Sequence, residues 1–392
     1  MTSIIANARL LEAAPGEGPS DILVEDGIVA RVTSARGAGA SGADRVFDAE
    51  GTFAAPGYID IHTHGGAGSD IMDARAESIE AIARFHLSRG TTSFLATTLT
   101  APLPSIAKAI DALRDFIRSP PSGCAAVLGV HIEGPFLSTA NAGAQDKVWL
   151  RSPDAEASDF VLANADMIRR VTLAPELEGS LAFIGRLRAA GIGVSAGHDA
   201  AVDDEIFAAI EAGLGAVTHI YCCSSGISRR AGPRKHLGLT EIGMADDRLV
   251  VEVIADRRAV PDLLFDLIWK AKGRDRICLV SDSVRVAGMP DGEYRLGDSE
   301  TGVLIEKRGD EASVPALGVY AGSVTTLAQS VRNLVAHNSL PLADAVHMAT
   351  AVPARLLGLR DRGRLAPGAL ADINLLDSAG NLLATFIQGE RA

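Results

Sequence analysis

The sequence predicts an α/β fold, a (β/α)8 TIM-like barrel with a small β-sandwich domain formed by the N- and C-terminal segments. Short apolar segments alternate with longer amphipathic segments through the middle of the chain, and eight of the apolar segments can be counted. Both ends of the chain instead carry short strands separated by turns. Alternating strands and helices are typical of parallel sheets, and eight such units close into a barrel whose active site lies at the carboxyl ends of its strands.

The two chain ends have the same β-rich character. In DILVEDGIVARV, apolar residues alternate around Asp26-Gly27, a pair that is typical of tight hairpin turns. The closing segment GRLAPGALADINLLDSAGNLLATFIQGE also has turn residues between short apolar runs. We therefore expect residues 1–56 and 360–392 to pair into the small domain, and residues 57–359 to form the barrel.

Most of the expected barrel strands end in a residue of a metal-binding type. The eight strands are expected at residues 58–64, 92–98, 125–134, 171–176, 193–198, 216–220, 250–256 and 277–282. The residues of interest at their carboxyl ends are His62, His64, Glu133, His198, His219 and Asp282. If polar residues were placed by chance, so many ligand-type groups would not share this position in a barrel.

The segment DIHTHGGAGSD ends the first of these strands with two histidines two residues apart. Side chains repeat every second residue along a strand, so both imidazoles face the same side, which one metal ion can use. The alternative is two half-buried histidines at a strand end. The convergence of the other strand ends favours the metal site, and the glycines that follow fit a tight loop that allows close approach.

Histidines elsewhere in the chain are expected to have structural roles. His131 lies two residues before Glu133 and could support a metal ligand, but we favour an ordinary core histidine. The others fall in helical or loop segments and are expected at the surface or in helix packing; they are His86, His236, His337 and His347.

A carboxylate with two to four histidines at one end of a barrel is typical of a divalent-metal site, most simply zinc, with one position left open for water. The ion lowers the pKa of that water to about 7. A nearby carboxylate must then move the proton from the water to the leaving group, and Asp282 in LVSDSV is the candidate. The alternative for Asp282 is a helix N-cap, but its position at the end of the last strand favours catalysis.

Composition argues against several classes of protein. The chain has 392 residues, 47% of them hydrophobic, and can bury a large core. Its net charge of -12 argues against nucleic acid or an anionic membrane surface as the main partner. Four cysteines without disulfide or zinc-finger spacing suit a reducing cytosol. No signal-like N-terminus or membrane-length apolar run is seen, so we expect a cytoplasmic protein.

The motifs together resemble a known family. They are similar over nearly the whole chain to the amidohydrolase superfamily, and within it to the N-acetylglucosamine-6-phosphate deacetylase family; the segments are APGYIDIHTHGGAG, GVHIEGPFL, TLAPE, SAGH, AVTHI, LVSDS, AGSVTT and GRLAPGALADINLLD. The resemblance implies a homodimer that hydrolyses an acetamide on a sugar phosphate. It also implies that Glu133, His198 and His219 are the principal metal ligands and that Asp282 is catalytic. With both His62 and His64, the chain resembles members that can hold two ions, bridged by the glutamate.

Three segments depart from the family pattern, and all three belong to the substrate-contacting part. Cys222 and Cys223 take the places of an Asn-Ala pair that helps to hold the phosphate, residues 256–259 lack the histidine of Asp-Gly-x-His, and residues 142–145 replace Lys-Gly-x-His. Arginine suits bidentate binding of phosphate or carboxylate, and Arg230 lies near the family's phosphate-binding arginine. The alternatives are a solvated charge run and two small packing cysteines. The candidate substrate contacts are Arg230, Cys222, Cys223, Gln145 and Arg258.

The leading hypothesis is a divalent-metal-dependent deacetylase, with one or two ions per chain, acting on a small anionic N-acetyl amino-sugar phosphate. A first alternative keeps the barrel and the metal but acts on another N-acyl compound or a cyclic amide, or deaminates its substrate. A second is a non-catalytic binding protein on the same scaffold, which the intact set of strand-end residues argues against.

Overall fold

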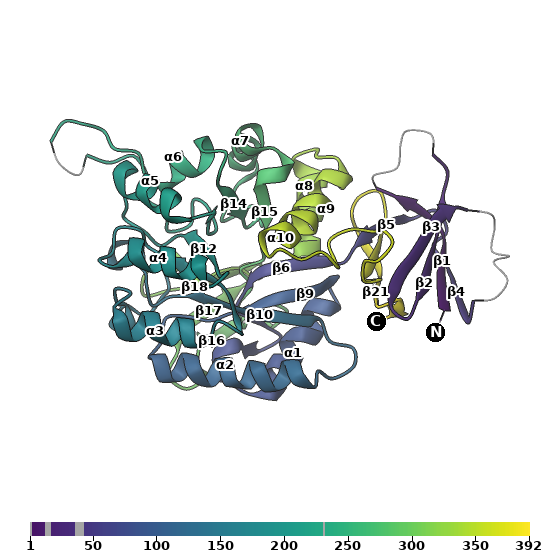
Figure 1. Cartoon of the computed structure of the whole chain (residues 1–392), viewed down its shortest axis with the longest axis horizontal. Helices are drawn as coiled ribbons and strands as arrows, with labels where there is room; N and C mark the ends of the chain where they lie inside the picture. The colour runs from purple at the N-terminus through teal and green to yellow at the C-terminus, as the bar shows by residue number, and fades with distance from the viewer. Residues whose placement is uncertain (1, 12–16, 36–42, 230–231) are drawn as a thin grey trace.

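A computed structural model describes residues 2–11, 17–35, 43–229 and 232–392. Figure 1 shows a large α/β part, with helices around a central set of strands, and a smaller β domain beside it that contains both chain ends. This is the predicted combination of a barrel with a terminal β domain.

The large part is built on eight parallel strands, one for each predicted segment. They are β6 (Tyr58–Thr63), β9 (Thr91–Thr97), β10 (Ala126–Glu133), β11 (Ile168–Leu173), β12 (Gly193–Ala196), β13 (Ala216–Val217), β14 (Val250–Val253) and β15 (Ile277–Leu279). The strands pair in the order of the sequence, and a parallel bridge between Thr63 and Ser283 connects the first to the segment after the last. The parallel barrel is therefore confirmed, and its carboxyl ends meet around one axis.

Helices cover the outside of the strands. They are α1 (Ala76–Leu87), α2 (Leu103–Arg118), α3 (Ala155–Ala163), α4 (Ser180–Ala189), α5 (Asp203–Ala212), α6 (Leu239–Ala245), α7 (Asp262–Lys272), α8 (Leu327–His337), α9 (Leu342–Ala349) and α10 (Ala351–Leu356). In α2, Ile106, Ile110 and Leu113 are buried at a spacing of three to four residues, which places them on one face. The Thr326 side chain accepts a bond from Gln329 N and caps the start of α8.

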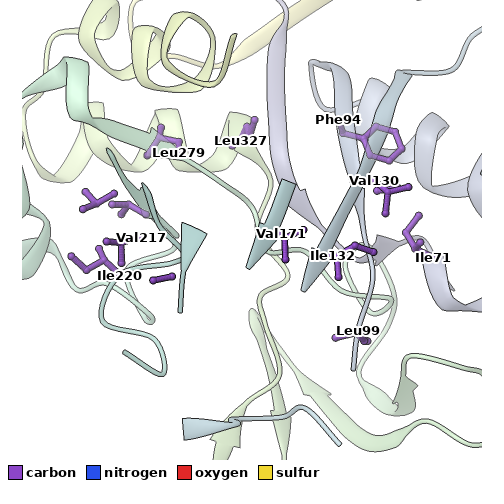
Figure 2. Packing of buried hydrophobic residues seen from close by; sticks show 14 of the residues in the cluster. Ile71, Phe94, Leu99, Val130, Ile132, Val171, Val217, Ile220, Leu279 and Leu327 are labelled. Atoms are coloured by element: carbon purple, nitrogen blue, oxygen red, sulfur yellow. The ribbon is translucent and has the colours of Figure 1, made fainter. Parts of the chain in front are cut away.

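The main core lies between the strands and the helices. Figure 2 shows Phe94, Val130, Ile132 and Val171 of neighbouring strands packed in this layer. The barrel interior is more polar, because Thr97, His131, Thr172, Ser195 and Thr218 form a chain of buried hydrogen bonds. Successive residues of a strand point to opposite faces. One set therefore forms the apolar layer under the helices, and the other forms the polar interior below the strand ends.

The small domain combines strands from both ends of the chain. Its strands are β1 (Thr2–Leu10), β2 (Ser20–Glu25), β3 (Ile28–Ser34), β4 (Arg45–Asp48), β5 (Phe53–Pro56), β20 (Ile373–Leu376), β21 (Leu382–Ile387) and β22 (Glu390–Arg391). β1 pairs with β2 and β4 near its start and with β5 near its end. The predicted Asp26-Gly27 turn joins β2 to β3, with positive φ at both residues. The segment between β3 and β4 lies largely outside the described residues.

A four-stranded antiparallel sheet between β15 and α8 is the part that our sequence interpretation lacked. Its strands are β16 (Gly292–Leu296), β17 (Val303–Arg308), β18 (Glu311–Val314) and β19 (Val319–Tyr320). The short segments β7 (Gly65–Gly66) and β8 (Ser69–Asp70) form a separate hairpin directly after His64. In the described part of the chain, no helix is long and apolar enough to cross a bilayer.

Candidate active site

Six side chains from five strand ends meet at one end of the barrel. Nε2 of His198 and Nε2 of His219 are 3.1 Å apart, and they lie 3.3 and 3.0 Å from Oε1 of Glu133. Nε2 of His64 lies 3.2 Å from both Oε2 of Glu133 and Oδ1 of Asp282. Nε2 of His62 lies 3.4 Å from Oε1 of Glu133 and 3.5 Å from Oδ1 of Asp282. All six side chains are buried.

The backbone turns sharply at three of these positions. His198, His219 and Asp282 have φ values of 50°, 26° and 48°, in the left-handed region that residues with a Cβ rarely adopt. Each lies just after a strand, so the turn directs the side chain toward the barrel axis rather than along the strand direction. Strained backbone of this kind is concentrated at functional sites.

Hydrogen bonds from neighbouring loops hold the ligand-type groups in place. Nδ1 of His198 bonds to the carbonyl of Asn141 at 3.0 Å. The Gln145 side chain donates to Oε2 of Glu133 at 2.8 Å, while its own oxygen accepts a bond from Thr100 N. At the last strand, Asp282 N donates to the carbonyl of His62 and thereby links the first and last barrel strands.

The electrostatics of the cluster favour a cation. Burial opposes the charged form of each group, but the mutual attraction of imidazoles and carboxylates outweighs it: the pKa of His64 is raised to about 9, and the pKa values of Glu133 and Asp282 are lowered. Nε2 of His62 is buried and has no hydrogen-bond partner among the described residues. Lone pairs of nitrogen and oxygen facing one another at these distances need a proton or a metal ion between them.

Two overlapping groups of three side chains could each hold a metal ion. The first contains His62, His64 and Asp282, and the second contains His62, Glu133 and His219. Within each group the donor atoms all lie within 4.8 Å of one another. Imidazole and carboxylate donors are those that divalent transition metals accept, so the residues present fit such an ion.

A cavity of about 240 Å³ opens onto the cluster. Of the residues predicted to contact substrate, Gln145, Cys222, Cys223 and Arg258 line it, whereas Arg230 lies outside the described residues. Burial raises the pKa of the Cys222 thiol. Arg258 is partly exposed and forms an ion pair with Glu311 at 2.9 Å. The sheet that our sequence interpretation lacked also contributes to the wall, through Leu296, Val319 and Tyr320.

Some residues at the site were not singled out from the sequence. Glu252, in the middle of β14, bonds through Oε2 to Nδ1 of His62 at 3.2 Å, and Arg170 of β11 forms a buried ion pair with its other oxygen. The signal for Glu252 in the sequence was its charge inside an otherwise apolar strand segment. His131 is a buried interior histidine, as favoured, but its ring also lies edge-on to that of His62, with 4.7 Å between centroids.

Comparisons with known proteins agree with this geometry. The profile of the Amidohydrolase family matches residues 53–392. An N-acetylgalactosamine-6-phosphate deacetylase of Escherichia coli O157:H7 is 32% identical over the full length of both chains, and an N-acetylglucosamine-6-phosphate deacetylase of Lysinibacillus sphaericus is 33% identical over 96% of this chain and 94% of its own. The structure of an N-acetyl-D-glucosamine-6-phosphate deacetylase mutant from Mycobacterium smegmatis, in complex with N-acetyl-D-glucosamine-6-phosphate, matches with a TM-score of 0.88 at 32% identity, covering 100% of this chain and 98% of the other.

The family depends on metal ions, which agrees with the two groups of donor side chains at the strand ends. The chain therefore belongs to the amidohydrolase family and is similar along its whole length to amino-sugar phosphate deacetylases.

Proposed function

We propose that the protein is a hydrolase that removes the acetyl group from an N-acetylhexosamine 6-phosphate. The observation that carries the proposal is the convergence of Glu133, His198, His219 and Asp282 in a small cavity at the strand ends. Relatives of similar identity are named for the N-acetylglucosamine and the N-acetylgalactosamine phosphates, so the proposal is made for the class that contains both.

We propose zinc as the metal, with one or two ions per chain. A tetrahedral site with bonds of about 2.0–2.1 Å has edges of about 3.3 Å, close to the 3.0 to 3.3 Å that separate the donor atoms of Glu133, His198 and His219. His62 and His64 would hold a second ion together with Asp282, and Glu133 would serve both. An ion bound there would lower the pKa of water and polarise an amide carbonyl.

Asp282 has the position that a general base and acid requires. Its Oδ1 lies 3.5 and 3.2 Å from Nε2 of His62 and His64, it is almost fully buried, and its pKa is lowered, because His62 and His64 outweigh the effect of burial. It is therefore ionised at neutral pH and ready to accept a proton from water as the water adds to the acetyl carbonyl carbon. It then donates that proton to the nitrogen as the C–N bond breaks, and acetate and the free amine leave.

The phosphate end of the substrate would be met by cationic side chains at the cavity mouth. Arg258 lines the cavity, and Arg230 is the second candidate from the sequence. Cys222 and Cys223 would contact the sugar, while Gln145 would act mainly by holding Glu133. These assignments are proposals that rest on position in the cavity and on the family pattern.

A substrate panel tests the proposal. We expect acetate release from the 6-phosphates of N-acetylglucosamine and N-acetylgalactosamine, and roughly 10- to 100-fold lower kcat/KM with the unphosphorylated sugars, because a charge-assisted bond to phosphate contributes about 1.5–3 kcal/mol. Turnover of neither sugar phosphate would contradict the proposal. Turnover of N-acyl amino acids or a cyclic amide instead would favour the second candidate, which the changed segments at Cys222-Cys223 and Ala259 make reasonable.

The first testable prediction concerns the proton transfer. Asp282→Asn should lower kcat by about 10²- to 10⁴-fold, because the amide cannot accept the proton from water. Metal content of the variant should be measured as well, because Asp282 also belongs to one donor group. The exposed Asp166→Asn serves as the control and should keep wild-type kcat. A metal-loaded Asp282→Asn enzyme with unchanged kcat would rule out this role.

We further propose a cytoplasmic homodimer and domain boundaries at residues 56/57 and 359/360. None of the four cysteines forms a disulfide, which suits a reducing compartment. Exposed apolar side chains, among them Tyr221, Ile227 and Tyr320, provide surface for a partner subunit, and Tyr221 and Tyr320 also line the cavity. Light scattering after size exclusion should give twice the chain mass of 40.7 kDa, and a monomeric mass would contradict the dimer.

A further inference from the structure

We infer that Glu252, held by Arg170, is a positioning residue that fixes the tautomer and the orientation of His62 for metal binding. The inference rests on the proposed metal site but not on the proposed substrate. It concerns three side chains that lie below the strand ends, inside the barrel, where the described structure shows no side-chain exposure at His62 or Glu252 and 4% at Arg170.

The contacts at the two ring nitrogens of His62 are of different kinds. Nδ1 lies 3.2 Å from Oε2 of Glu252, and Nε2 points toward the oxygens of Glu133 and Asp282. A carboxylate can only accept a hydrogen bond, so a neutral ring can serve a metal ion on the Nε2 side only when its single proton lies on Nδ1 and is donated to Glu252. The lone pair then lies on Nε2, the atom that faces the donor groups and could coordinate an ion.

His62 is the side chain common to both candidate metal groups. A ring flip or the opposite tautomer would therefore remove a donor from each group, rather than from one. The imidazole of His131 also restricts the ring, because it lies edge-on to it with 4.7 Å between centroids, and Asp60 holds the main chain by accepting a bond from the backbone nitrogen of His62 at 3.3 Å. Glu252 is the carboxylate at Nδ1, whereas Glu133 and Asp282 face Nε2, where an ion would lie.

Arg170 explains how a carboxylate can remain at this depth. Burying an unpaired charge inside a barrel costs free energy. Arg170 of β11 supplies the opposite charge and forms an ion pair with Glu252. Oε2 of Glu252 also lies 3.5 Å from the backbone nitrogen of His219, so the same carboxylate contacts ligands on two different strands. Replacing a carboxylate that bonds to the second ring nitrogen of a ligating histidine commonly lowers metal affinity by 10–100-fold.

The test is metal titration of purified protein after removal of bound ions, with zinc as the probe and no substrate present. Glu252→Met alone leaves Arg170 buried without a partner and is at risk of unfolding, so the main variant is the pair Arg170→Met and Glu252→Met, which replaces an ion pair by apolar groups of similar size. We expect this double variant to fold, as judged by circular dichroism, and to bind the zinc ion held by His62 10–100-fold more weakly, while an ion held by Glu133, His198 and His219 alone should keep its affinity. Glu252→Gln keeps an oxygen acceptor for Nδ1 and should recover part of the affinity.

Ser195→Ala is the matched control. Ser195 is fully buried in the same polar interior, where it bonds to Thr172 and Thr218, and no hydrogen bond joins it to the metal cluster among the described residues. It should bind zinc as the wild type does. Wild-type affinity for every bound zinc ion in a folded double variant would overturn the inference.

A measurement on the wild type gives a second, independent test. Nitrogen-15 spectra of the zinc-loaded protein with labelled histidine should show the ring of His62 protonated at Nδ1, and a proton on Nε2 or coordination through Nδ1 would overturn the inference. Because neither experiment involves substrate, failure of the deacetylase proposal in the substrate panel would leave both readouts unaffected.

Discussion

Buried histidines in this protein differ according to the groups they face. His64 faces two carboxylates, and its pKa is raised to about 9 even though burial acts in the opposite direction. His86 is equally buried but faces the hydroxyl of Thr63 and the carbonyl of Gly65, and burial lowers its pKa to about 4. The first ring belongs to the proposed metal site, whereas the second connects α1 to the strand end that carries the metal-site histidines.

The titration of His86 predicts acid sensitivity of the fold. Its folded-state pKa lies below the usual 6.5, so the unfolded chain binds more protons between pH 6.5 and 4. The stability contributed by the neutral ring is complete above pH 6.5 and is lost as the pH falls toward 4, on the order of 3 kcal/mol in all. Urea unfolding of His86→Gln at pH 7 and pH 4.5 should show a smaller acid loss than the wild type.

The exposed His337→Gln is the matched control for this prediction, because it removes a histidine from the surface end of α8. It should lose stability in acid to the same extent as the wild type. Equal acid losses in His86→Gln and the wild type would show that His86 does not couple folding to pH.

The sequence predicted the site residues that end strands and missed those that act from inside the barrel. Glu133, His198, His219 and Asp282 could be found because the carboxyl ends of parallel strands converge, whatever the details of packing. The contact between Glu252 and His62 joins residues 190 positions apart, and which side chains face each other inside a barrel depends on stagger and packing. Likewise, the packing of His131 against His62 is not visible in the spacing of either residue.

Elements outside the eight-unit pattern shape the site. The sheet β16–β19 lies in the chain between the last barrel strand and α8. It was not predicted because all eight expected barrel strands end by residue 282. The chain then returns to the barrel through Gly322, which has φ of 67°. A Cβ at this position would meet the carbonyl oxygen of Asp282 and a methyl of Val284, both at 2.7 Å.

Gly322→Ala should therefore displace the backbone of Asp282 and lower kcat at least tenfold, while a strain of about 1–2 kcal/mol lowers the free energy of unfolding. Gly318→Ala is the matched control: its φ is 63°, but no described atom lies within 4 Å of the added Cβ. Both variants carry the same kind of backbone strain, so the contacts with Asp282 and Val284 are what separates them. Steady-state kinetics together with urea unfolding measures both effects, and equal kcat in the two variants would contradict the argument.

The small domain supports the stability of the barrel, whereas the barrel itself contains the candidate active site. The small domain contacts the barrel at the start of β6, where Gly57 N donates to the carbonyl of Asp372. The site lies at the opposite, carboxyl ends of the strands. Asn374 of β20 is fully buried at this junction; it donates to the carbonyl of Gly90 and accepts from the hydroxyl of Thr385.

Asn374→Ala should lower the free energy of unfolding by about 1–3 kcal/mol, because it removes the bond to the carbonyl of Gly90 and leaves the hydroxyl of Thr385 buried without its partner. It should leave kcat and zinc affinity unchanged, since the junction and the metal cluster occupy opposite ends of the barrel strands. Asn381→Ala, in a half-buried turn of the same domain, is the control and should cost less stability. Urea unfolding, kinetics and zinc titration of both variants check the prediction. A fall in kcat at Asn374 without loss of stability would show that the terminal domain acts on the site directly rather than by supporting the barrel from its other end.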